Sequence, residues 1–135
     1  MLLTLDTYQP LADTIRMSLS HPVIKSFPYA ISGLKTAIKN EPNFRFHLVA
    51  AVIATSLGIY LKLSPMEYAL LFLAIGFVVI MELVNTMLEA LVDLVSPEIQ
   101  EHAKIAKDVS AAAVLLSAIL SLIIGAFLFI PKILS

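Results

Sequence analysis

Three long apolar segments limit what this chain can fold into. They cover about residues 46–61, 68–94 and 109–130, and the second and third are long enough to cross a bilayer as helices. The first is short, but Arg45 and Lys62 at its ends can extend their charges to the interface. Only 14% of the 135 residues are charged, too few to cover a water-soluble domain of this size. The sequence therefore predicts an all-α integral membrane protein.

Proline and its neighbours predict where the spanning helices begin and end. Serine–proline pairs at 64–65 and 96–97 are typical of a helix N-cap followed by proline at the first helical position. Pro131 is expected to end the third helix. The predicted spans are about 44–61, 66–94 and 99–130.

An amphipathic segment precedes the first span. Within residues 23–40, apolar side chains recur at three- and four-residue steps while the lysines take other faces, which is typical of a helix lying in the membrane interface. We therefore predict an N-terminal extension, residues 1–22, followed by one membrane domain, residues 23–135.

Basic residues are divided unequally between the two sides of the predicted spans. Lys62 and Lys132 fall on one side, and the other seven Lys and Arg residues fall on the opposite side. Those seven are Arg16, Lys25, Lys35, Lys39, Arg45, Lys104 and Lys107. The positive-inside rule predicts that their side is cytoplasmic.

The second span carries a polar stripe that membrane insertion alone does not require. Glu82, Asn85, Glu89 and Asp93 stand at i, i+3, i+7 and i+11, so they share one face of a helix. Ionisable residues inside a span cost at least a few kcal/mol and commonly mark a functional site. The alternative is a stripe that holds helices together in an oligomer.

A second polar cluster stands at the start of the third span. Lys104, Lys107 and Asp108 are spaced to share a face, and two lysines beside an acid suit a polyphosphate with its Mg²⁺. The alternative is ordinary cytoplasmic anchoring by basic residues. Glu41, at the break before the first span, would join Glu89 as a carboxylate ligand of the kind Mg²⁺ accepts.

Several kinds of site are excluded by what the chain lacks. It has no cysteine, which excludes disulfides and thiolate chemistry, and no glycine-rich phosphate loop. Its formal net charge of -1 gives no reason to expect a nucleic-acid partner. The three histidines share no ligand spacing, so no zinc site is expected, and His47 is interpreted as an interfacial polar residue.

Three segments of the chain resemble the prokaryotic diacylglycerol kinases, a family that includes the undecaprenol kinases. They are residues 33–45, 82–93 and 103–115. The second contains the specific pattern E-x-x-N-[ST]-x-x-E-x-x-x-D, and the resemblance covers roughly residues 23–133. Residues 44–48 and 103–108 look closest to the undecaprenol kinase branch.

The resemblance implies a kinase that transfers the γ-phosphate of MgATP to a membrane lipid hydroxyl. The expected substrate is undecaprenol, giving undecaprenyl phosphate, with diacylglycerol, giving phosphatidic acid, as the alternative. It also implies a homotrimer with sites between subunits, in the bacterial inner membrane, with the active site at the cytoplasmic face. A small proton- or cation-coupled transporter and a non-catalytic assembly partner are the competing interpretations.

The same resemblance assigns roles to individual residues. Glu82 matches the general base, and Glu41 and Glu89 match the Mg²⁺-binding acids. The ATP-binding positions are Tyr29, Glu41, Glu89, Glu98, Gln100, Lys107 and Asp108. The substrate-binding positions are Lys35, Arg45, Glu82 and Asn85. Two positions depart from the family's pattern, because Pro22 stands where an arginine is usual and Gln100 where a histidine is usual.

Overall fold

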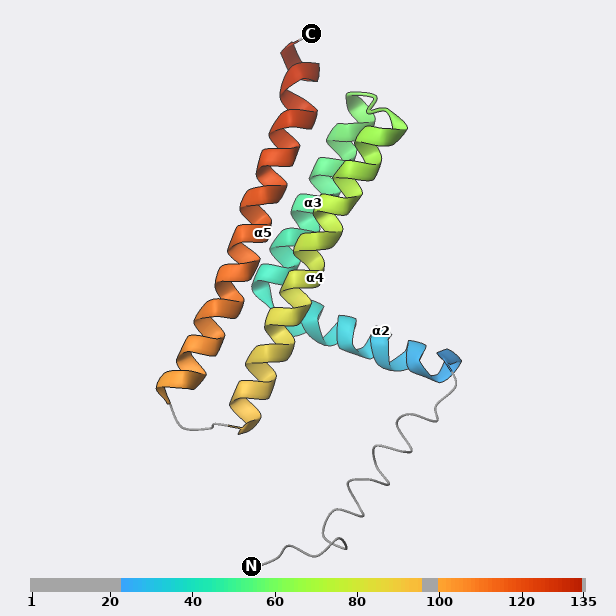
Figure 1. Ribbon diagram of the computed structural model, residues 1–135. Helices are drawn as coiled ribbons and strands as arrows, with labels where there is room; N and C mark the ends of the chain where they lie inside the picture. Colours follow the sequence, from blue (N-terminus) through green and yellow to red (C-terminus); the bar gives the residue numbers. More distant parts are fainter. Residues whose placement is uncertain (1–22, 96–99, 135) are drawn as a thin grey trace, which may run out of the picture. The chain divides into compact units, whose positions relative to one another are not determined.

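The chain is all-α wherever the structure describes it. The computed structural model describes residues 23–95 and 100–134. Their helices are α2 Val23–Asn40, α3 Pro42–Tyr60, α4 Pro65–Val95 and α5 Glu101–Leu134 (Figure 1). The last three are each long and apolar enough to cross a membrane, which confirms the predicted fold class. The chain divides within α2, between Lys35 and Thr36, into two compact units.

The expected end of the third spanning helix was wrong. α5 continues through Pro131 to Leu134. A proline removes one backbone hydrogen bond and crowds the preceding turn, but an unpaired backbone group in lipid costs several kcal/mol. Keeping the remaining helical bonds therefore outweighs the local defect. The expected start at residue 99 and the serine–proline pair at 96–97 lie outside the described residues.

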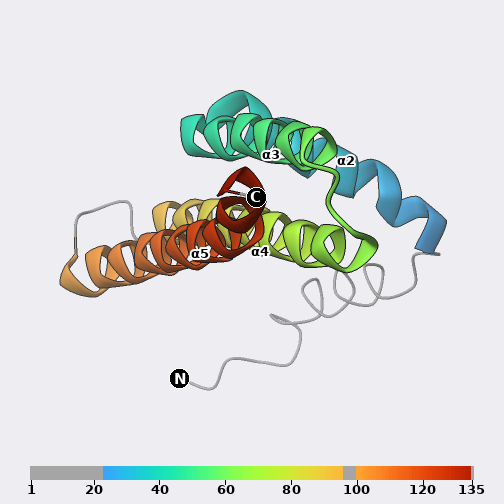
Figure 2. The ribbon, with the colours of Figure 1, turned by 90° about the horizontal axis from the view of Figure 1, so that it is seen from above.

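α4 is the most buried of the spanning helices. It packs against both α3 and α5, and Figure 2 shows α3 lying across one side of the α4–α5 pair. In the most apolar window of each helix, 28% of α4 is buried, against 11% of α3 and of α5. Large apolar side chains such as Phe72, Leu116 and Phe127 remain exposed, which suits contact with lipid rather than water.

Backbone hydrogen bonds fix the turn between α3 and α4. Lys62 has a φ of 54°; its N–H donates to the Ile59 carbonyl at 3.2 Å, and the Leu63 N–H donates to the Gly58 carbonyl at 3.0 Å. This pair of bonds is the Schellman motif, which satisfies the last free carbonyls of a helix. A Cβ at Gly58 would lie 3.0 Å from the Leu63 side chain, so glycine lets Leu63 fold back over the helix end.

α4 begins with the capping residue that the sequence predicts. The Ser64 N–H donates to Glu67 Oε2 at 2.6 Å, and the Glu67 N–H donates to Ser64 Oγ at 3.4 Å, which is a capping box. Glu67 Oε2 also lies 3.2 Å from Lys132 Nζ near the end of α5. The same end of the bundle holds a buried apolar cluster of Leu63, Leu71 and Leu128. Capping, an ion pair and apolar burial together hold the three helices at this end.

Replacing Ser64 with alanine tests the capping box. We expect Ser64→Ala to lower the free energy of unfolding by about 0.5–1 kcal/mol, because an N-cap hydroxyl contributes about this much. The measurement is reversible unfolding in mixed micelles, followed by helicity. Ser56→Ala is the control, since Ser56 Oγ donates to the Val52 carbonyl inside α3 and caps no helix. Equal stability of the two variants would contradict the capping role.

Candidate functional site

α4 carries the polar stripe from the interior of the bundle outward. Glu82 and Asn85 are buried, Glu89 is half-buried and Asp93 is exposed. Glu82 is only 2% exposed. Burial therefore decreases steadily toward the end of α4, and the contacts that these side chains make with α3 and α5 agree with the predicted shared face.

The carboxylate of Glu82 meets α3 through His47. His47 Nε2 lies 3.2 Å from Glu82 Oε1, but the direction does not satisfy a hydrogen bond, and Oε1 has no hydrogen-bond partner among the described residues. Thr86 Oγ1 donates to the Glu82 backbone carbonyl at 3.0 Å and leaves the carboxylate untouched. Glu82 thus presents a buried acceptor with an unused lone pair.

Asn85 links α4 to α5 through both atoms of its amide. Ser110 Oγ donates to Asn85 Oδ1 at 2.7 Å, and Asn85 Nδ2 donates to Glu89 Oε1 at 2.9 Å. Ser110 Oγ also lies 2.9 Å from the Lys107 carbonyl of its own helix. A buried amide with both ends paired has one favoured orientation, so Ser110 indirectly fixes the position of Glu89.

Lys107 meets the stripe from the side of α5. Its Nζ lies 2.5 Å from Asp93 Oδ1, and Glu89 also interacts with it electrostatically. Glu89 and Glu41 in turn both interact electrostatically with Glu82. The fold therefore gathers four carboxylates and one lysine, from three helices, at one end of the bundle.

The oxygen donors of this region fit Mg²⁺, which is usually held by one or two carboxylates together with substrate phosphates. Glu41 stands at the N-cap of α3 without making a side-chain capping bond, and Glu89 uses Oε1 to accept from Asn85. Both therefore retain carboxylate oxygens for a cation. Within residues 23–95 and 100–134, no three His, Cys, Asp or Glu side chains are grouped to hold a metal.

Arg45, predicted to bind substrate, contacts the backbone of α2. Its Nη1 donates to the carbonyls of Ile38 at 3.2 Å and Lys39 at 2.9 Å. These are among the last carbonyls of α2, which lack partners within the helix. Arg45 therefore caps the end of α2, and its role toward substrate stays a prediction.

The remaining predicted residues take no part in the hydrogen bonds and ion pairs described above. Tyr29 and Lys35 are exposed on α2 ahead of Thr36, and Asp108 is exposed on α5. Gln100 precedes α5, where its carbonyl accepts from the Lys104 N–H at 3.0 Å. Glu98 and Pro22 lie outside the described residues. The nucleotide assignments of these positions stay predictions.

Two residues that contact the polar stripe, His47 and Ser110, were not predicted from the sequence. His47 was interpreted as an interfacial polar residue, yet it lies against the buried Glu82. Ser110 stands between the lysine–aspartate pair and a run of alanines, and no motif marks it. In both cases the available signal was a polar side chain on the inward face of a span. Ser110 stands three residues after Lys107. His47 stands three residues after Phe44, which is 0% exposed.

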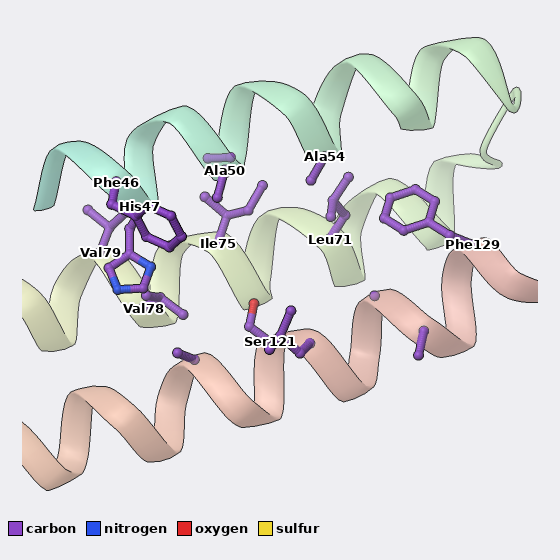
Figure 3. Close-up of a pocket in the computed structure, with 15 residues that line it drawn as sticks. Phe46, His47, Ala50, Ala54, Leu71, Ile75, Val78, Val79, Ser121 and Phe129 are labelled. Atoms are coloured by element: carbon purple, nitrogen blue, oxygen red, sulfur yellow. The ribbon is translucent and has the colours of Figure 1, made fainter. Parts of the chain in front are cut away.

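An apolar groove of about 550 Å³ lies between α3, α4 and α5 (Figure 3). Ala50 and Ala54 line it from α3, while Leu71 and Phe129 lie near the end that holds the α3–α4 turn. His47 lies at the opposite end, and of the described lining residues only His47 and Ser121 are polar. The groove has the size of many ligand sites, and His47 at its polar end lies beside Glu82.

Comparison with known proteins gives one consistent family. The sequence profile of the prokaryotic diacylglycerol kinases matches residues 28–129. The undecaprenol kinase of Bacillus subtilis (strain 168) is 41% identical over 108 residues, covering 80% of this chain and 88% of the relative. The diacylglycerol kinase of Synechocystis sp. is 42% identical over 114 residues, covering 84% of this chain and 65% of the relative. That of Escherichia coli (strain K12) is 35% identical over 101 residues, covering 75% and 83%.

A chain with three spanning helices, a buried acidic site and these relatives is a membrane-embedded lipid kinase. It belongs to the prokaryotic diacylglycerol kinase family. The family resemblance that the sequence suggested is therefore confirmed, and with it ATP as phosphate donor and a lipid as acceptor.

Replacing Ser110 with alanine tests the link between α5 and Asn85. We expect Ser110→Ala to lower stability by about 1–3 kcal/mol, because the buried Asn85 Oδ1 loses its donor, and to lower kcat because Glu89 is less well fixed. Ser117→Ala is a matched control, since Ser117 is equally buried but donates to Val114 of its own helix at 2.7 Å. The measurements are unfolding in micelles and lipid phosphorylation. Parental kcat in Ser110→Ala would contradict the link.

Proposed function

We propose that this lipid kinase phosphorylates a polyprenol such as undecaprenol to give undecaprenyl phosphate, with diacylglycerol, giving phosphatidic acid, as the alternative acceptor. The carrying observation is the buried Glu82 Oε1, which has no hydrogen-bond partner among the described residues. Glu82 lies one helical turn beyond Val78 and Val79, which line the apolar groove. An unpaired buried acceptor costs about 1–3 kcal/mol or more, and this carboxylate, not committed to other groups, is available to a lipid hydroxyl at the end of the groove.

Glu82 acts in this proposal as the general base. The lipid hydroxyl oxygen forms a bond to the γ-phosphorus of ATP while the bond from that phosphorus to the β–γ bridging oxygen breaks. ADP leaves, and the hydroxyl proton passes to Glu82. A positioned base contributes about 10²–10⁴-fold to such a reaction, and Asn85, beside it on the same face, would orient the hydroxyl.

The charged end of the stripe is proposed as the nucleotide site. Glu41 and Glu89 would hold Mg²⁺, which when bound neutralises charge on the phosphates, and Lys107 would contact phosphate. Glu41 and Glu89 interact electrostatically with Glu82, and Glu89 also interacts with Lys107, which supports this assignment. Further nucleotide contacts are proposed for Tyr29, Glu98, Gln100 and Asp108. Further contacts to the lipid are proposed for Lys35 and Arg45.

The apolar groove is proposed as the site of the hydrocarbon chain next to the lipid hydroxyl. Its lining is almost entirely apolar and comes from all three spanning helices, and its one end at His47 meets the proposed base. The undecaprenol kinase among the relatives favours a polyprenyl chain. The diacylglycerol kinases, at 42% and 35% identity, keep an acyl chain as the alternative.

We also propose a homotrimer in the bacterial inner membrane, with active sites between subunits at the cytoplasmic face. Two carboxylates without a third metal-binding group in the described residues leave room for a partner's contribution. Ala111 and Ala112 are exposed on α5 and would allow a neighbouring helix to approach closely. Lys104 and Lys107 lie at the site end, which supports a cytoplasmic location for it.

A phosphorylation assay tests the proposed reaction and its base. Purified protein in mixed micelles receives MgATP with undecaprenol or with a diacylglycerol, and phosphorylated lipid is measured. We expect undecaprenol to give the higher kcat/KM, and Glu82→Gln to lower kcat by about 10²–10⁴-fold, because the amide cannot accept the proton. No phosphorylated lipid from either acceptor, or a Glu82→Gln variant as active as the parent, would reject the proposal.

Filling the groove tests the proposed chain site. Ala50 is exposed and lines the groove, so Ala50→Leu should raise the KM for undecaprenol about tenfold, equivalent to about 1.4 kcal/mol of lost binding. The KM for ATP should stay unchanged. Ala69→Leu is the control, because Ala69 is exposed on α4 outside the lining. If Ala50→Leu alters the oligomeric state in cross-linking but leaves the lipid KM unchanged, the groove holds a second copy instead.

A further inference from the structure

His47 is the residue that joins the apolar groove to the buried acid. It lies on α3, lines the groove, and has a side chain that is only 19% exposed. Its ring contacts the edge of the Phe46 ring, with centroids 5.6 Å apart and planes at 76°. Figure 3 shows the imidazole at one end of the groove, beside Val78 and Val79 of α4. The packing of the ring therefore holds Nε2 close to Glu82, 3.2 Å from Oε1.

A buried glutamate needs something to hold its carboxylate in one place. Glu82 has flexible side-chain torsions, and holding such a side chain in one rotamer has an entropic cost. The hydroxyl of Thr86 bonds only to the Glu82 backbone, so it fixes the helix and not the acid. His47 Nε2 at 3.2 Å is within hydrogen-bond distance of Oε1, and a small rotation of the ring would align the two.

The negative charges around Glu82 are a second reason why its carboxylate needs a group that holds it in one position. Glu41 from the start of α3 and Glu89 from α4 both interact electrostatically with Glu82. Like charges at short range push a carboxylate away or leave it disordered between positions, whereas a donor on the opposite side balances them. His47 provides an N–H donor on the α3 side of Glu82, at the point where the lipid hydroxyl of the proposed reaction arrives.

We propose that His47 is a positioning residue for Glu82. The Nε2–H of His47 donates to Oε1 of Glu82, and the other carboxylate oxygen of Glu82 is left to receive the proton of the lipid hydroxyl. This inference rests on the proposed function, in which Glu82 is the base. His47 would act through Glu82 and would not itself contact phosphate. This role would explain how the carboxylate of Glu82 on α4 is oriented toward the hydroxyl of a lipid whose hydrocarbon chain lies in the groove between α3, α4 and α5.

Two replacements of His47 separate its hydrogen bond from its volume. His47→Phe keeps a ring but removes the donor, and we expect kcat to fall about 10–100-fold, as when an outer partner of an active group is removed, with both KM values nearly unchanged. His47→Gln places an amide N–H close to the position of Nε2 and should retain most of kcat. Val49→Ala is the control, because Val49 is exposed two residues along α3.

The same replacements in a Glu82→Gln background show whether His47 acts through Glu82. We expect His47→Phe to cause no further loss there, since residues that act as a unit are not additive. Parental kcat in His47→Phe, equal losses in the Phe and Gln variants, or an undiminished loss in the Glu82→Gln background would each overturn the proposal.

An infrared measurement tests the contact without relying on turnover. The carboxyl band of Glu82 is isolated as the difference between the parent and Glu82→Gln. We expect His47→Phe to shift that band and His47→Gln to leave it close to the parent's. An unshifted band in His47→Phe overturns the positioning role even if the parent phosphorylates lipid. A shifted band in a protein that phosphorylates no lipid would show that the proposed function, and not the contact, has failed.

Discussion

The burial of Glu82 within a membrane-spanning helix is the constraint on which the rest of the site depends. An ionisable group at this depth costs several kcal/mol unless the fold supplies partners, so α4 must turn its polar face toward α3 and α5 rather than toward lipid. That rotation brings Asn85 to Ser110 and Asp93 to Lys107. One unfavourable side chain therefore determines the orientation of α4, and the orientation of α4 assembles the site.

The two ends of the bundle are held by different kinds of interaction. The end with the α3–α4 turn is fixed mainly by backbone bonds, a capping box and a buried leucine cluster, together with the ion pair between Glu67 and Lys132. The end with the acids is connected through side-chain hydrogen bonds and ion pairs, which depend on each partner being present. Stability concentrated at one end leaves the other free to carry polar groups that a folding core would exclude.

Features that depend on local sequence patterns were predicted correctly. Contacts between side chains on different helices could not be predicted in this way. The Ser64 cap and the face shared by Glu82, Asn85 and Glu89 follow from neighbours within a few turns. The Asn85–Ser110 bond joins residues 25 positions apart, and the contact of His47 with Glu82 depends on how two helices are rotated about their axes. Pro131 shows the opposite failure, because a rule for helix ends in water does not weigh the cost of an unpaired backbone group in lipid.

The ion pair between Lys107 and Asp93 has a consequence for how tightly any anion can be held at that lysine. A phosphate that binds at Lys107 would compete with the Asp93 carboxylate, which already lies 2.5 Å from Nζ, so part of one ion pair would be exchanged for another. The net gain in binding is the difference between the two, and it is smaller than that of a lysine surrounded only by water. Such an exchange favours quick release, because the outgoing anion is replaced at once by a tethered one.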